Sequence, residues 1–108
     1  MNKLLIVATI CALAFAHTPS FAGGDAAAGK NKTQVCAACH GADGNSAAPE
    51  FPKLAGQHAD YLQKSLERYK NKTRNNAIMN GFAANLSEQD IADIAAYFSS
   101  QKGLVVKY

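Results

Sequence analysis

The chain has 108 residues and a formal net charge of +3, and hydrophobic residues make up 48% of it. That length suits a single domain, and so mild a positive charge argues against nucleic acid as a partner. A domain of this size buries only a modest core, so it often depends on a disulfide, a metal or a cofactor for stability.

Residues 1–22 have the pattern of a secretory signal peptide. Lys3 precedes an apolar run from Leu4 to Ala16, and Ser20-Phe21-Ala22 forms a small-x-small cleavage site. The run is shorter than the roughly 20 residues that a membrane-spanning helix needs. We therefore expect cleavage after Ala22, export to the periplasm of a Gram-negative bacterium without stable membrane insertion, and a mature domain of residues 23–108.

Two helices are predicted in the first part of the mature domain. The first covers about residues 25–38, which are rich in alanine and begin with an acidic residue that suits a helix N-terminus. The second covers about residues 57–71. There, one apolar stripe recurs at i, i+4 and i+7 in Leu62, Leu66 and Tyr69.

The third predicted helix has the clearest boundaries. Ser87 is a suitable N-cap, with Asp90 at the capping-box position. Gly103 follows the end of the helix. The expected buried face consists of Ile91, Ile94, Ala95 and Phe98.

Two segments without helical periodicity separate the three helices. GADGNSAAPEFPKLAG is dense in turn-forming residues, and NKTRNNAIMNGFAAN is polar at its start and apolar around Met79. The only candidate for a strand is Leu104-Val105-Val106 at the C-terminal end. The sequence therefore predicts a small all-α domain with three main helices, and long loops in so compact a chain usually have a function.

Cys36-Ala-Ala-Cys39-His40 places three reactive side chains together. A disulfide between the cysteines would close a very small loop and contribute little stability. A thioredoxin-like pair needs a βαβ setting, and a structural zinc site needs a second ligand pair, of which only His58 is present. Covalent haem attachment uses all three residues, two thiols for the vinyl groups and an imidazole for the iron. The motif thus predicts one covalently bound haem c with His40 as the proximal iron ligand.

The haem iron needs a second axial ligand or keeps an open position. Met79 lies in an apolar loop just before the third helix, where its thioether could reach the opposite face of the haem. The alternative is that Met79 fills a gap in the core, as buried methionines often do. His58 is the other conventional candidate, but its place beside Gln57 and Asp60 is more typical of a surface or capping residue.

CAACHGADGNS, PEFPKLAGQ, the isolated Met79 and NLSEQDIADIAAYFSSQKG together resemble class I cytochrome c. The resemblance covers essentially the whole mature chain and is closest to the cytochrome c-four subgroup and its single-domain relatives. Members of that subgroup carry two such domains and two haems, whereas this sequence has one motif. The resemblance implies a small class I cytochrome c fold, with helices and long loops wrapped around one haem. It also implies thioether bonds from Cys36 and Cys39 and axial ligation by His40 and Met79.

The family pattern implies three further features. The backbone carbonyl of Pro49 would accept a hydrogen bond from the proximal imidazole, and Pro52 is the alternative for that role. Gly29 would let the first and last helices cross closely near Tyr97, although a tolerated helix glycine is the simpler interpretation. The residues expected to line the haem pocket are Leu54, Leu66, Ile78 and Phe82.

The same reasoning predicts an electron carrier rather than an enzyme. Two protein ligands leave no open position for oxygen or peroxide, and a thioether favours reduced iron. We expect a monomer or weak dimer that shuttles single electrons between a membrane quinol-oxidising cytochrome complex and a terminal oxidase or reductase. The alternatives are a ligand sensor or small peroxidase with a labile sixth position, and a subunit permanently docked to one enzyme.

Charged residues provide a candidate docking surface. A basic run opposed only by Glu67 is formed by Lys64, Arg68, Lys70, Lys72 and Arg74. Such a run is most often a solvated surface, and the alternative is a salt-sensitive landing site for an acidic partner. An acidic patch is expected on the third helix, formed by Glu88, Asp90 and Asp93.

Overall fold

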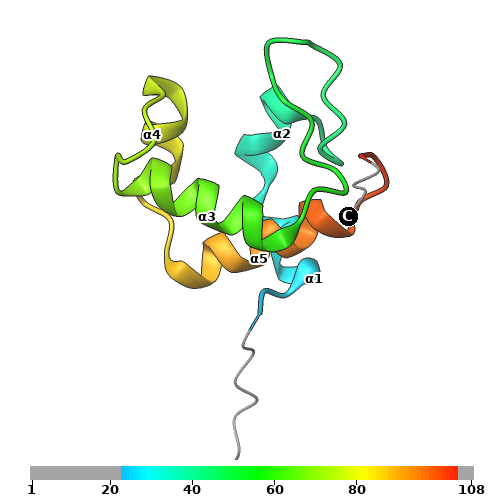
Figure 1. Ribbon diagram of the computed structural model, residues 1–108. Helices are drawn as coiled ribbons and strands as arrows, with labels where there is room; N and C mark the ends of the chain where they lie inside the picture. The colour runs from blue at the N-terminus through cyan, green and yellow to red at the C-terminus, as the bar shows by residue number, and fades with distance from the viewer. Residues whose placement is uncertain (1–22, 105–108) are drawn as a thin grey trace, which may run out of the picture.

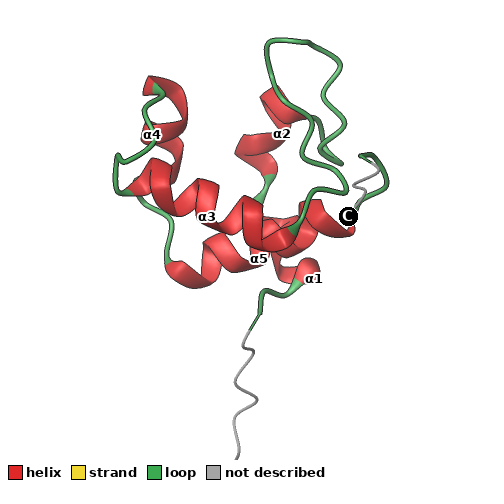
Figure 2. Ribbon diagram, viewed as in Figure 1, coloured by secondary structure: helices red, strands yellow, loops and turns green. Residues whose placement is uncertain are grey.

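The computed structural model describes residues 23–104, which form five helices and no strand (Figures 1 and 2). The predicted all-α class is confirmed, although five helices replace the three main ones expected. The expected signal peptide, residues 1–22, and most of the candidate strand lie outside the described residues. Within residues 23–104, no helix is long and apolar enough to cross a membrane.

The first predicted helix is divided into two. α1 spans Ala26–Lys32 and α2 spans Gln34–His40, and Thr33 between them has φ −100° and ψ 7°. The Thr33 hydroxyl donates to the carbonyl oxygen of Lys30 at 3.0 Å, a local bond that competes with continuation of the helix. The prediction of one helix over residues 25–38 is therefore wrong, and both cysteines of the motif belong to α2.

The second and third predicted helices are present almost as expected. α3 spans Ala59–Lys70 and α5 spans Glu88–Ser100. The capping box is complete, because the Asp90 amide donates to Ser87 Oγ at 3.0 Å and the Ser87 amide donates to Asp90 Oδ2 at 2.9 Å. The whole predicted face of α5 is buried, namely Ile91, Ile94, Ala95 and Phe98.

The segment around Met79 contains a helix that the sequence did not predict. α4 spans Ala77–Ala83, and its N-cap Asn76 accepts hydrogen bonds through Oδ1 from the amides of Ile78 and Met79, at 3.1 and 3.0 Å. Seven residues are too few to establish a helical period, and a glycine inside the segment lowers its helix propensity further. The prediction of a loop here is wrong, and the capping asparagine was the available signal.

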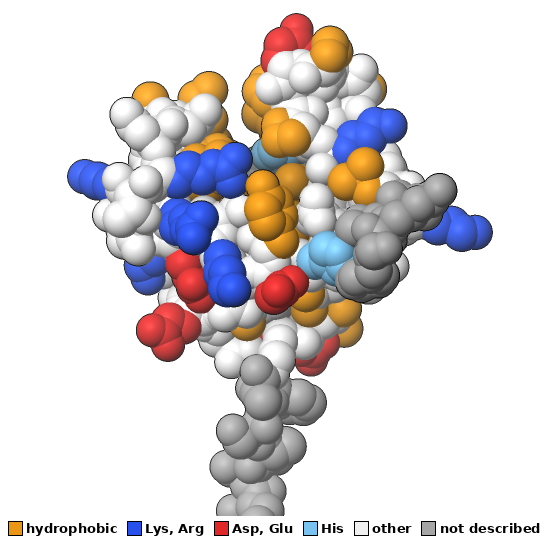
Figure 3. All heavy atoms as spheres, viewed as in Figure 1, with side chains coloured by type: hydrophobic (Ala, Val, Ile, Leu, Met, Phe, Trp, Pro, Cys, Tyr) orange, Lys and Arg blue, Asp and Glu red, His pale blue; other side chains and the backbone are white. Residues whose placement is uncertain are grey.

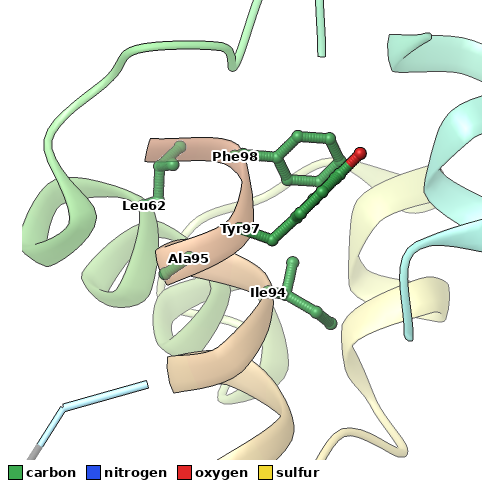
Figure 4. Packing of buried hydrophobic residues seen from close by; sticks show 5 residues of the cluster. All are labelled: Leu62, Ile94, Ala95, Tyr97 and Phe98. Atoms are coloured by element: carbon green, nitrogen blue, oxygen red, sulfur yellow. The ribbon is translucent and has the colours of Figure 1, made fainter. Parts of the chain in front are cut away.

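The core lies where α5 packs against α1 and α3. Leu62 of α3 forms one buried hydrophobic cluster with four residues of α5, Ile94, Ala95, Tyr97 and Phe98 (Figure 4). The aromatic rings of Tyr97 and Phe98 have centroids 5.2 Å apart. On α1, buried Gly29 lies directly against α5, which confirms the close crossing that the resemblance implied.

The long loop between α2 and α3 is attached to α5 at both of its ends. The Tyr97 hydroxyl donates to the carbonyl oxygen of Ala42 at 2.7 Å, and the Gly56 amide donates to that of Phe98 at 3.0 Å. Gly44 has φ +81°, and a Cβ there would lie 2.7 Å from the Phe98 ring. These anchors leave the middle of the loop standing beside α2, away from the core (Figure 1).

Candidate cofactor site

A cleft of about 340 Å³ opens between α2, α3, α4 and the long loop. Clefts of this order accommodate small molecules and cofactors. Cys36, Cys39, His40 and Met79, the residues expected to hold the haem, all line it. Figure 3 shows the molecule hollowed between α4 on one side and α2 with the loop on the other, with hydrophobic side chains along the hollow.

The cleft gathers most of the large hydrophobic side chains that the described chain exposes. Four of them border it, with exposed fractions of 49–59%: Val35, Tyr61, Ile78 and Phe82. The expected pocket residues Leu54, Leu66, Ile78 and Phe82 all line the cleft, as predicted. Exposed apolar side chains gathered on one concave surface indicate that a largely apolar group fills it. A haem macrocycle fits this lining.

Cys36 and Cys39 are unpaired and partly buried at the cleft. Burial raises the pKa of the Cys36 thiol above its ordinary value. Within residues 23–104, no cluster of three His, Cys, Asp or Glu side chains could hold a metal ion. The disulfide and zinc alternatives therefore find no support in this part of the chain.

His40 is buried, and its Nδ1 atom lies 2.8 Å from the carbonyl oxygen of Pro52. Because a carbonyl oxygen can only accept, we assign the ring proton to Nδ1, which leaves the Nε2 lone pair for a metal. The choice of Pro49 as acceptor is wrong, and the alternative, Pro52, is the partner. The Phe51 amide donates to the carbonyl oxygen of Ala48 at 3.1 Å, closing a turn that leaves Pro49 exposed.

Met79 lies in the first turn of α4, across the cleft from α2 (Figure 1). It is partly exposed and does not belong to the hydrophobic core cluster. The interpretation of Met79 as a core gap-filler therefore fails. His58, the other candidate, is the N-cap of α3 and does not line the cleft.

Sequence reasoning missed the polar part of the cleft wall. Arg74 lines the cleft with its Cζ 4.8 Å from the centroid of the Tyr69 ring, and its Nη1 donates to Ser65 Oγ at 3.2 Å. Tyr61 and Ser65 lie four residues apart on α3, and the same spacing leads on to Tyr69 of the predicted stripe. That spacing was the signal from which Tyr61 and Ser65 could have been found.

The five basic residues, here called the basic ridge, are all exposed: Lys64, Arg68, Lys70, Lys72 and Arg74. Lys and Arg side chains gather over α3 and the segment that joins α3 to α4 in Figure 3. The expected acidic patch is wrong in one member, because Asp93 is only 2% exposed. Its carboxylate accepts hydrogen bonds from the Asp25 amide at 2.8 Å and from Lys32 Nζ at 2.7 Å.

Comparisons with known proteins identify the family. Residues 26–102 match the family model described as Cytochrome c. A cytochrome c4 from Pseudomonas aeruginosa is 56% identical over 104 residues, which cover 94% of this chain and 50% of that protein. Cytochrome c-554(548) from Halomonas halodenitrificans is 52% identical over 82 residues, covering 73% of this chain and 99% of that protein.

Among solved structures, a reduced recombinant cytochrome c4 from Pseudomonas stutzeri is similar, with a TM-score of 0.72 at 54% identity. The match covers 76% of this chain and 48% of that one. The chain thus spans about half the length of these cytochrome c4 relatives. The resemblance noted in the sequence is confirmed by all of these matches.

Proposed function

The chain belongs to the cytochrome c family and binds haem c covalently, and from this premise we propose that it is a periplasmic one-electron carrier. Cys36 and Cys39 form the thioether bonds, and His40 and Met79 are the axial ligands. The observation that carries the proposal is the convergence of these four side chains on one apolar cleft. When bound there, the haem iron supplies a couple that accepts and returns one electron.

The contact between His40 and Pro52 supports the proximal role. The hydrogen bond from Nδ1 fixes the orientation of the ring and makes Nε2 a stronger ligand. The ring also lies edge-on to Phe51, with centroids 6.5 Å apart, so two neighbours restrict its rotation. A ligand held in this way needs little rearrangement when the charge of the metal changes.

The cleft lining favours the reduced state. The oxidised centre carries one more positive charge, and apolar side chains such as Leu54, Leu66 and Phe82 disfavour that charge. The Met79 thioether acts in the same direction, because a thioether ligand raises the reduction potential of the iron relative to a second histidine ligand. Two protein ligands also leave no position for substrate, which is the reason to propose a carrier and not an enzyme.

Export and partners are part of the same proposal. Residues 1–22 direct secretion and residues 23–108 form the monohaem domain. The donor is a membrane quinol-oxidising cytochrome complex, and the acceptor is a terminal oxidase or reductase. The exposed basic ridge supports a partner with an acidic surface, since charge complementarity speeds encounter.

Absorption spectra of the purified holoprotein, oxidised and reduced, test the ligand pair. The oxidised protein should show the long-wavelength band of thioether-to-iron coordination, and Met79→Ala should abolish it. The reduced native protein should resist carbon monoxide, whereas Met79→Ala should bind it and have a lower potential. Rapid binding of carbon monoxide by the native protein would instead indicate the sensor or peroxidase. An unchanged potential in Met79→Ala would refute ligation by Met79.

A further inference from the structure

α4, the helix that carries Met79, makes few contacts that would stabilise it on its own. Its seven residues are fewer than the roughly 12–15 that make an isolated helix even marginally stable in water. Among the described helices it packs only against α3, and Ala83 is its one buried residue. Ile78 and Phe82 line the cleft, where they would pack on the bound haem and not on α3. The attachment of α4 to α3 therefore depends largely on polar contacts.

Asn80 supplies three of these contacts through one side chain. Its Nδ2 donates to the carbonyl oxygens of Tyr69 at 2.8 Å and Arg74 at 2.9 Å, and its Oδ1 accepts from the Asn76 amide at 2.9 Å. The side chain therefore joins the last turn of α3, the turn that follows it and the start of α4. The Tyr69 carbonyl, in the last turn of α3, also accepts from the Lys72 amide at 3.3 Å.

The contacts of Asn80 extend to Met79 through Asn76. Asn76 Oδ1 accepts from the Met79 amide at 3.0 Å, and the backbone amide of Asn76 is held by Asn80. Met79 and Asn80 are also neighbours in the chain. Losing the Asn80 amide would therefore loosen both the N-cap residue of α4 and the attachment of α4 to α3, while leaving the Met79 side chain unchanged.

We infer that Asn80 is a positioning residue that keeps Met79 at the cleft and so keeps the sixth coordination position closed to outside ligands. The inference rests on the proposed function, in which Met79 is the axial ligand. Without the three hydrogen bonds, α4 moves away from α3 more often, and an external ligand competes with the thioether for the iron. Apparent affinity for that ligand rises in proportion to the open population.

Carbon monoxide binding to the reduced holoprotein tests the inference. Asn80→Ala removes all three bonds, and Asn80→Asp removes both donors but keeps the acceptor for the Asn76 amide. We expect each variant to bind carbon monoxide at least about tenfold more tightly than the native protein, a change that the loss of two or three hydrogen bonds can produce. The thioether band of the oxidised protein should weaken in parallel. The matched control is Asn85→Ala, at an exposed asparagine just beyond α4, and should leave both readouts unchanged.

Met79→Ala in the same assay separates this inference from the proposed function. If Met79→Ala binds carbon monoxide tightly while Asn80→Ala and Asn80→Asp behave like the native protein, Asn80 does not hold the site closed and the inference is overturned. If Met79→Ala itself binds no more tightly than the native protein, the ligand assignment and the inference fall together. A lower unfolding midpoint with native carbon monoxide affinity would indicate a merely structural role, which also overturns the inference. If Asn80→Ala yields no folded holoprotein, the carbon monoxide affinity of Asn80→Asp alone decides whether the inference holds.

Discussion

Gly29 of α1 and Tyr97 of α5 lie so close that a Cβ on Gly29 would be 2.8 Å from the Cβ of Tyr97. The same atom would be 2.0 Å from the carbonyl oxygen of Asp93, which is backbone and has little freedom to move. The crossing brings α1 onto the helix that carries most of the core. The absence of a side chain at residue 29 is therefore a requirement of the fold.

Gly29→Ala should destabilise the protein strongly. Forcing atoms into a packed site typically costs about 1–3 kcal/mol, and a backbone clash belongs at or above the top of that range. The gain in helix propensity, about 1 kcal/mol, offsets only part of it. Denaturant unfolding of the holoprotein measures the effect. Gly81→Ala is the matched control, because a Cβ there meets no atom within 4 Å, and it should be neutral or slightly stabilising. Equal effects of the two substitutions would contradict the crossing.

The cluster of Lys32, Asp90 and Asp93 predicts that the folded protein loses stability in acid. The hydrogen bond from Lys32 contributes most to lowering the pKa of Asp90, to about 2. Burial alone would raise the pKa of Asp93, but hydrogen bonds from the Asp25 amide, Lys32 and Gln89 together lower it. Both carboxyls therefore lose their protons at lower pH in the folded chain than in the unfolded one. Their contribution to stability is complete above about pH 4, the ordinary carboxyl range, and disappears as the pH falls towards 2.

Unfolding free energies measured from pH 7 down to pH 2 check this prediction. The native protein should lose stability mainly below pH 4, and Asp93→Asn should be less stable at pH 7 with a smaller loss on acidification. Asp60→Asn, at an exposed carboxyl on α3, serves as the control and should retain the native profile. A native pH dependence in Asp93→Asn would show that the cluster does not titrate as described.

The same cluster shows where sequence reasoning stops. Asp93 was placed on an acidic surface, but its partners, the Asp25 amide and Lys32, are 68 and 61 residues away in the chain. The Ser87–Asp90 capping box was predictable because both of its hydrogen bonds are made within four residues. Periodicity likewise located α3 and α5, since it reports local geometry.

The errors at the cofactor site come from local contacts that leave no periodic signal. The local motif predicted which residues line the cleft, but the choice between Pro49 and Pro52 depends on a turn within an irregular loop. The break at Thr33 and the short helix α4 depend on single hydrogen bonds and caps, which leave almost no periodic signal. The residues that line the cleft were therefore predictable from the sequence, and their supporting contacts were not.

The basic ridge predicts the charge preference of a reaction partner. Reduction of the small anionic oxidant ferricyanide should slow with added salt, because screening weakens the attraction of the ridge. Lys64→Glu with Arg68→Glu should slow the reaction at low ionic strength, with little effect at high ionic strength. The control changes as many charges elsewhere, with Lys30→Glu and Lys102→Glu, both exposed. If the two double variants slow the reaction equally, only net charge matters and the ridge is not a docking surface.

Mass spectrometry of a tryptic digest under denaturing conditions tests the central claim most directly. Cleavage after Lys32 and Lys53 isolates residues 33–53, which contain Cys36 and Cys39, whatever the fate of the signal peptide. This peptide should carry the added mass of one haem. Either single Cys→Ser variant should keep at most one thioether bond, and the double variant should keep none. A peptide of bare polypeptide mass from the native protein, purified from cells that mature c-type cytochromes, would contradict covalent attachment at these cysteines.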